Sequence, residues 1–337
     1  MKWCNRTCPT RVGLLVLTAG LVAACDQGPI TQDATSETPS TIAATDLMMA
    51  HIPDHREALL ERLASAATVE EAMDMVNEQL ASEGLNFELG MVEYVTQAGS
   101  DLAGQTVFRN DRTKRLGSYW VAGDERREAD GDNLTQLTFD LFADANFGTP
   151  AEVDGERAID SSFGTFNNTS CSTLNVVKRP DAGVLPSAIL GIEPFLADIS
   201  TIGFLPGFIF DFFLFDGASE NVLGVTFTFW FIDGPGGPPT DIDSNGKLDT
   251  ALKEIWYNDD FLWTTNGGGI DIETVALHEN GHALEMGHFG RIARTNRNGK
   301  LHVSPRAVMN AVILGDLREL LGTDNAAFCG NFAKWPN

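Results

Sequence analysis

A short stretch near the C-terminal end, HENGHALEMGH (residues 278–288), constrains this chain more than any other feature. It holds three of the six histidines in 337 residues, and a glutamate directly follows the first of them. His278 and His282 are four residues apart, so in an α-helix they lie on one face, about 6 Å apart along the axis. Both imidazoles can then reach one metal ion at about 2.1 Å. The spacing therefore predicts a helix that carries two metal ligands.

The rest of this stretch predicts an open, catalytic metal site. Glu279 lies about 100° around the helix from His278, where its carboxylate can act as general base on a water bound to the metal. His288 becomes the third ligand only if the helix ends and the chain turns back, and Gly287 supplies a permissive backbone before it. Three histidines plus water are typical of catalytic zinc. A core helix with incidental histidines is the alternative, although chance gives this spacing in only about one such chain in ten thousand.

These residues resemble the zinc signature of the metzincin peptidases, H-E-x-x-H-x-x-G-x-x-H, and most closely its matrixin type. Met309, in SPRAVMN, resembles the methionine of the turn that lies beneath the zinc ligands. EIWYNDDFLWTT (254–265) resembles the strand that precedes the site helix in matrixins. The resemblance spans roughly residues 135–335. It implies an α/β (α+β) fold with a zincin-like catalytic domain, in which a twisted mixed sheet carries an active-site helix.

The function that the resemblance implies is a zinc-dependent endopeptidase acting on protein or peptide substrates. Zinc polarises the scissile carbonyl, and Glu279 activates the zinc-bound water and later protonates the leaving amine. An alternative of another class is a catalytically weak, metal-binding surface lipoprotein with an adhesive or scaffolding role. A further alternative takes Glu319 as third ligand in place of His288, as in thermolysin-like enzymes.

The sequence departs from the family signature at Glu285, where metzincins have glycine. That glycine often adopts a left-handed conformation, which costs another residue on the order of 1 kcal/mol. The spacing favours a chain that leaves the helix at residue 285, and Glu285→Gly should then stabilise the protein or leave its stability unchanged. A helix that continues to Gly287 is the alternative. Trp256 stands where matrixins place a histidine of their structural zinc, so we expect a single, catalytic zinc.

A second candidate metal site is DIDSNGKLD (241–249). Oxygen donors at alternate positions, with glycine at the sixth, resemble the start of an EF-hand calcium loop. The glutamate expected at the twelfth position is absent, because that residue is Leu252. An acidic turn without an ion is the alternative in so acidic a chain. The candidate calcium ligands are Asp241, Asp243, Asn245 and Asp249.

The N-terminal end predicts export. Residues 1–24 combine a basic start with an apolar run too short to span a bilayer comfortably, as in a signal peptide. The run ends in LVAAC, which resembles a bacterial lipobox and implies lipidation of Cys25; a plain signal peptide cut near Ala24 is the alternative. We therefore expect a lipid-anchored protein of the bacterial cell envelope, with the inner or outer membrane left open. The net charge of -24 disfavours nucleic acid as a partner.

Composition also predicts how the chain is divided. Residues 25–46 are rich in Ser, Thr, Pro and Asp and are typical of a flexible linker. We expect an N-terminal α+β module over residues 47–130, either a propeptide or a docking module, followed by the matrixin-like peptidase domain over residues 131–337. In an exported protein the two remaining cysteines, Cys171 and Cys329, predict a disulfide, with metal ligation as the alternative.

Overall fold

The protein has a mixed α/β structure, which confirms the predicted fold class at that level. The predicted signal peptide, Cys25 and the predicted linker lie outside the described residues. The computed structural model describes residues 54–109, 117–129, 131–138, 155–180, 186–266, 268–295 and 297–336.

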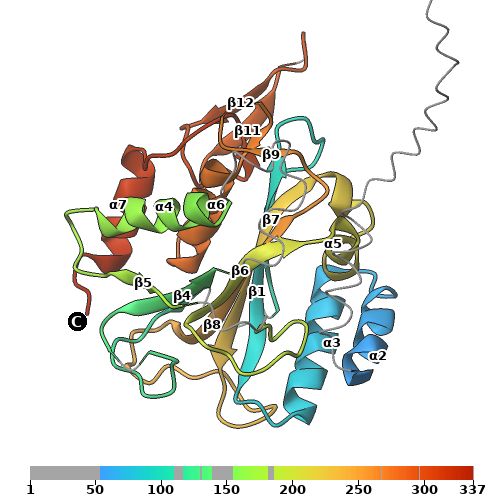
Figure 1. Cartoon of the computed structure of the whole chain (residues 1–337), viewed down its shortest axis with the longest axis vertical. Helices are drawn as coiled ribbons and strands as arrows, with labels where there is room; N and C mark the ends of the chain where they lie inside the picture. The colour runs from blue at the N-terminus through green and yellow to red at the C-terminus, as the bar shows by residue number, and fades with distance from the viewer. Residues whose placement is uncertain are drawn as a thin grey trace, which may run out of the picture. The chain divides into compact units, whose positions relative to one another are not determined.

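The N-terminal part begins with two helices, α2 (Asp54–Leu63) and α3 (Val69–Ser82), which lie side by side (Figure 1). The side chain of Thr68 accepts a hydrogen bond from the backbone amide of Glu71 and so caps α3. A hairpin follows, made of β1 (Phe87–Gln97) and β2 (Gln105–Phe108).

A large mixed sheet forms the centre of the protein, in the order β13-β1-β7-β8-β6-β4-β5. Strand β7 is antiparallel to both of its neighbours, β1 and β8, whereas the strands from β8 to β5 are parallel to one another. The short strand β3 pairs with β8. The other strands of the sheet are β3 (Ser118–Tyr119), β4 (Leu134–Thr138), β5 (Val176–Lys178), β6 (Ile199–Leu205), β7 (Val222–Phe231), β8 (Leu248–Asn258) and β13 (Val312–Ile313).

Because β1 pairs with β7 along nearly its whole length, the predicted N-terminal module and the predicted peptidase domain share one sheet. All the described residues belong to a single compact unit. All ten residues of β7 are buried, as expected for a central strand that is covered on both faces. Aromatic residues and threonines alternate along it, so that Phe227 packs against Phe213 while Thr226 faces the helix with the histidines.

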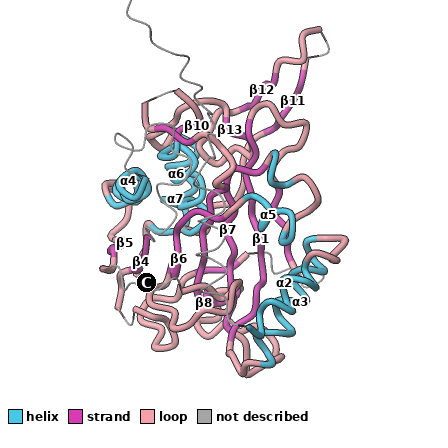
Figure 2. Tube along the Cα trace, turned by 45° about the vertical axis from the view of Figure 1, so that its right-hand side comes forward, coloured by secondary structure: helices cyan, strands magenta, loops and turns pink. Residues whose placement is uncertain are grey.

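Helices cover both faces of the sheet. The helices α4 (Gly155–Asn167), α6 (Ile272–Ala283) and α7 (Gly322–Phe332) gather on one side, and α2, α3 and α5 (Gly207–Phe213) on the other (Figures 1 and 2). Helix α6 packs between α4 and the strands β7 and β8, which places the predicted site helix against the middle of the sheet. The remaining elements are η2 (Ala218–Glu220), β9 (Trp263–Thr264), β10 (Ile270–Asp271), β11 (Arg291–Arg294) and β12 (Leu301–Ser304).

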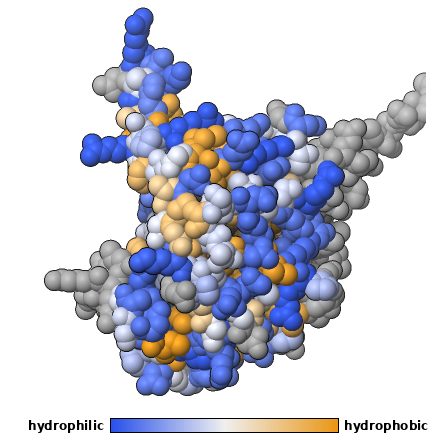
Figure 3. Space-filling model, turned by 90° about the vertical axis from the view of Figure 1, so that its left-hand side faces the viewer, coloured by the Kyte–Doolittle hydropathy of each residue, from blue (hydrophilic) through white to orange (hydrophobic). Residues whose placement is uncertain are grey.

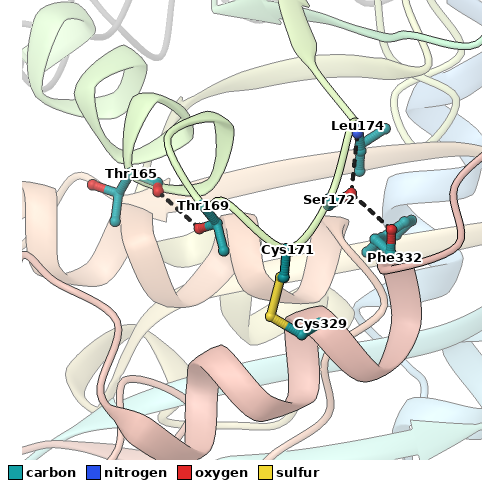
Figure 4. Close-up of a disulfide and its surroundings, with 7 residues drawn as sticks. All are labelled: Thr165, Thr169, Cys171, Ser172, Leu174, Cys329 and Phe332. Atoms are coloured by element: carbon teal, nitrogen blue, oxygen red, sulfur yellow. Dashed lines mark hydrogen bonds between the residues drawn. A yellow bond between two sulfur atoms is a disulfide. The ribbon is translucent and has the colours of Figure 1, made fainter.

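A disulfide joins Cys171, which follows α4, to Cys329 of α7, as predicted (Figure 4). The hydroxyl of Ser172 donates to the carbonyl of Phe332 beside it at 2.8 Å. Hydrophilic residues dominate the face in Figure 3, with apolar residues in small separate groups, in keeping with the strongly acidic composition. None of the described helices has both the length and the apolar character that a bilayer crossing requires.

Candidate metal centre

Helix α6 holds two of the predicted ligands and the predicted base. It begins after Asp271, whose side chain accepts a hydrogen bond from the amide of Thr274 at 2.8 Å. His278, Glu279 and His282 are all 0% exposed, because the helix is covered by α4 on one side and by the sheet on the other. A helix buried all round needs no single apolar stripe, and its buried polar side chains require hydrogen-bond partners.

The three histidines converge on one point. The Nε2 atom of His282 lies 3.0 Å from that of His278 and 3.2 Å from that of His288, and the third Nε2 pair is 3.3 Å apart. Three ligands at about 2.1 Å from a tetrahedral ion are about 3.4 Å from one another. The triangle therefore fits a zinc ion, and these ring atoms are one of the two groups of candidate metal ligands among the described residues.

The other ring nitrogen of each histidine is held by a hydrogen-bond partner. The Nδ1 atom of His278 lies 2.7 Å from the carbonyl of Val308, and that of His282 lies 2.8 Å from the carbonyl of Met286. A carbonyl only accepts, so both Nδ1 atoms carry the proton and both Nε2 lone pairs face the centre. Burial lowers the pKa of His282 to about 3 and the pKa values of His278 and His288 well below their usual value. Burial thus favours the neutral form of the rings, which is the form that binds a metal.

His288 reaches the centre because α6 ends in a tight turn. The amide of Met286 donates to the carbonyl of Gly281 at 2.9 Å, and that of Glu285 donates to the carbonyl of His282 at 3.0 Å. These two bonds define a Schellman motif, which needs a left-handed residue at position 285. Glu285 has φ of 60°, which confirms the predicted departure from the helix at this residue.

The side chain of Glu285 explains why this position is not glycine. Its carboxylate accepts from the hydroxyl of Thr250 at 2.7 Å and from that of Ser118 at 3.0 Å, and it lies 3.1 Å from the ammonium of Lys253. Lys253 also donates to the carbonyl of His282 at 2.7 Å. The ion pair thus ties the turn after α6 to strand β8 behind the metal ligands.

Glu279 lies over strand β7. Its Oε2 atom accepts a hydrogen bond from the hydroxyl of Thr226 at 2.7 Å. Gly224 lets the carboxylate approach the strand closely, since a Cβ atom there would come within 2.9 Å of Oε1. The Oε1 atom is buried and has no hydrogen-bond partner among the described residues. Burial raises the pKa of Glu279 well above its usual value, and Thr226 counteracts this by stabilising the charged form.

Met309 lies against the site helix, as the resemblance implies. A Cβ atom at Gly281 would come within 2.3 Å of its Sδ atom, so the missing side chain makes the space that the methionine fills. Asp324 of α7 accepts hydrogen bonds from the amides of Val308 and Met309 at 2.9 and 3.1 Å. This contact fixes the turn whose carbonyl holds His278.

Sequence reasoning missed two residues of the N-terminal hairpin. The Oε2 atom of Glu93 lies 3.2 Å from the Nδ1 atom of His282. The hydroxyl of Thr106 lies 3.4 Å from the Nδ1 atom of His288. One signal was present in the sequence, since Glu93 interrupts the apolar strand GMVEYV with a charge and is only 2% exposed in the fold. Glu319, the alternative third ligand, is exposed and does not belong to the histidine group.

The second candidate site, in residues 241–249, brings Asp241, Asp243 and Asp249 together. The side chain of Asn245 accepts from the amide of Lys247 at 2.7 Å, as in a closed polar turn. The Oδ2 atom of Asp249 also lies 2.9 Å from the guanidinium of Arg126, a cation already in place at this carboxylate. Calcium binding therefore stays a prediction, with Arg126 as a competitor that the sequence did not reveal.

Comparison with known proteins adds nothing to this picture: no known protein family matches the chain, and no curated protein is detectably similar to it.

Proposed function

We propose that this chain is a zinc-dependent endopeptidase with a zincin-like catalytic domain of the metzincin type. The observation that carries the proposal is the convergence of three imidazoles, with Nε2 atoms 3.0 to 3.3 Å apart, next to a buried glutamate. Imidazole ligands suit zinc, and three protein ligands leave a fourth position open for catalysis.

Each residue has a role in peptide hydrolysis. His278, His282 and His288 would hold the zinc ion, which would supply Lewis-acid polarisation of the scissile carbonyl. Glu279 takes a proton from the attacking water and gives it to the leaving amine. Thr226 holds one carboxylate oxygen of Glu279 at 2.7 Å, and this leaves the other oxygen for proton transfer.

The proposal extends to the location of the protein. Residues 1–24 direct export, Cys25 carries lipid, and residues 25–46 tether the peptidase to a membrane of the bacterial envelope. The features that support this are the apolar run before LVAAC and the polar composition after it.

A second candidate function has one observation in its favour. His278, Glu279 and His282 are completely buried. Such burial fits a closed, non-catalytic metal site as well as it fits an enzyme whose site is covered. In that case the protein is a metal-binding surface lipoprotein with a structural or adhesive role.

One experiment separates the two functions. Residues 26–337 are purified, their zinc content is measured, and cleavage of a denatured protein is followed with and without a chelator. For a peptidase, Glu279→Gln keeps zinc and loses nearly all cleavage, because glutamine cannot accept the proton. Glu273→Gln, in the first turn of the same helix, is the matched control and keeps both properties. Zinc binding by the wild type without chelator-sensitive cleavage would favour the second function.

A further inference from the structure

We propose that Glu93 of β1 and Thr106 of β2 are positioning residues of the metal centre, so that the N-terminal hairpin is a working part of the site. This inference rests on the proposed binding of zinc by His278, His282 and His288. It concerns the side chains that contact the ligands at the ring nitrogen facing away from the metal.

The two residues form a single unit. They face each other across the hairpin as a cross-strand pair, and the hydroxyl of Thr106 donates to Oε1 of Glu93 at 3.0 Å. From this pair Oε2 of Glu93 reaches to within 3.2 Å of Nδ1 of His282, while the hydroxyl of Thr106 lies 3.4 Å from Nδ1 of His288. Two of the three ligands are thus contacted at the nitrogen that faces away from the metal.

The hydrogen bond between Thr106 and Glu93 determines which ring nitrogen of His288 carries the proton. A hydroxyl has one proton, and Thr106 donates it to the carboxylate of Glu93. Toward His288 the same oxygen can only accept, so Nδ1 carries the proton and Nε2 offers its lone pair to the metal. Thr106 thus does for His288 what the carbonyls of Val308 and Met286 do for His278 and His282.

Glu93 places a buried carboxyl group behind the ligands. Burying a carboxylate is costly unless a cation or strong donors compensate it. Lys253 already has Glu285 at 3.1 Å as its ion-pair partner. Glu93 instead lies against the ligand His282, whose Nδ1 proton is donated to the carbonyl of Met286, and a carboxylate beside a metal-bound imidazole increases its basicity. A divalent ion bound by the three histidines would supply the positive charge that stabilises the buried carboxylate of Glu93.

A consequence follows for the N-terminal segment, which the sequence leaves open as a propeptide or a docking module. All but the last of the eleven residues of β1 are buried, and β1 pairs with β7 beside the site. Removal of residues 87–108 would take away the partners of His282 and His288. The zinc-loaded protein therefore retains this segment.

The test measures zinc affinity by competition with a coloured chelator on the full chain after residue 25. Glu93→Gln should weaken zinc binding by about 10- to 100-fold. Glu88→Gln is the matched control, because Glu88 lies on the same strand and pairs with Arg109 away from the histidines. It should bind zinc within about twofold of the wild type. The visible spectrum of the cobalt-substituted protein should shift for Glu93→Gln and stay unchanged for the control.

Two further variants separate positioning from folding. Thr106→Val should weaken zinc binding about tenfold, whereas Thr106→Ser keeps the hydroxyl and should keep the affinity. Glu93 and His288 also line a cavity of about 270 Å³, so formate can enter beside them. Formate should restore part of the affinity lost in Glu93→Ala and should not affect the Glu88→Ala control.

The outcomes are distinct. Wild-type affinity and an unchanged cobalt spectrum in Glu93→Gln, or equal affinities of Thr106→Val and Thr106→Ser, would overturn the role of the hairpin while leaving the zinc site intact. A wild-type protein that binds no zinc would instead refute the proposed function itself.

Discussion

The ammonium of Lys253 lies 3.1 Å from the carboxylate of Glu285, and the two side chains are only 0% and 3% exposed. This pair joins strand β8 to the turn that delivers His288 to the metal centre. It accounts for a glutamate in a left-handed conformation with φ of 60°, because the ion pair offsets the backbone strain. Lys253 also donates to the carbonyl of His282, so the pair supports two of the three ligands.

The ion pair reverses the effect expected of Glu285→Gly from conformation alone. Glycine relieves about 1 kcal/mol of strain, but it leaves Lys253 buried without its partner, which costs about 3–5 kcal/mol. We expect a net loss of about 2–4 kcal/mol in the free energy of unfolding, measured by urea denaturation. Ser244→Gly is the control, because Ser244 has φ of 57° and is exposed. A Glu285→Gly variant more stable than the wild type would show that the pair contributes little.

Gly281→Ala should destabilise the protein although alanine is the better helix former. Its Cβ atom would meet Sδ of the buried Met309 at 2.3 Å, and the resulting overpacking costs about 1–3 kcal/mol. Gly164→Ala in α4 is the control, since nothing lies within 4 Å of a Cβ there, and it should stabilise by about 1 kcal/mol. Thermal melts with zinc content measured alongside test both. An equal rise in melting temperature in the two variants would contradict the close contact between Gly281 and Met309.

Glu254 should make stability depend on pH. It is fully buried in β8, and burial raises its pKa to about 7 from an ordinary value of 4.5. The folded protein therefore binds this proton more tightly than the unfolded chain. The contribution to stability is complete below about pH 4.5 and is lost as pH rises toward 7, by up to about 3 kcal/mol.

Glu254→Gln should flatten this pH dependence, because glutamine does not titrate and can still accept the hydrogen bond from Ser187. Urea denaturation between pH 5 and pH 8 measures how the free energy of unfolding depends on pH. A chelator is present so that pH-dependent metal binding does not contribute. Glu319→Gln, at an exposed position, is the control. Identical pH profiles of Glu254→Gln and the wild type would exclude Glu254 as the source.

The disulfide should stabilise the protein strongly, because Cys171 and Cys329 are 158 residues apart. The chain-entropy model gives about 3–5 kcal/mol for a loop of this size. We expect a loss of that order in the variant with both cysteines changed to serine. Ser172→Ala keeps the disulfide and removes two hydrogen bonds beside it, the one that the hydroxyl donates to Phe332 and the one that it accepts from the amide of Leu174, and should cost only about 1–2 kcal/mol. Ready thiol labelling of the unreduced native protein would show that the bond does not form.

Much of the metal centre was predictable because it is local in sequence. The four-residue spacing places His278 and His282 on one helix face whatever surrounds the helix. The left-handed position at residue 285 follows from the separation of six positions between His282 and His288, which leaves no room for another helical turn. The cap at Thr68 and the pairing of the two remaining cysteines were likewise predictable from short-range chemistry or from counting.

The tertiary structure alone decided which residues support the ligands. Lys253 precedes Glu285 by 32 positions, and Glu93 precedes His282 by 189, so no local pattern connects either pair. Their contacts arise because β1, β7 and β8 lie side by side in one sheet beneath α6. The sequence by itself determined which side chains can bind a metal, since that depends on residue type and spacing. Only the fold determined the buried charges and hydrogen bonds behind them, since these depend on strand order.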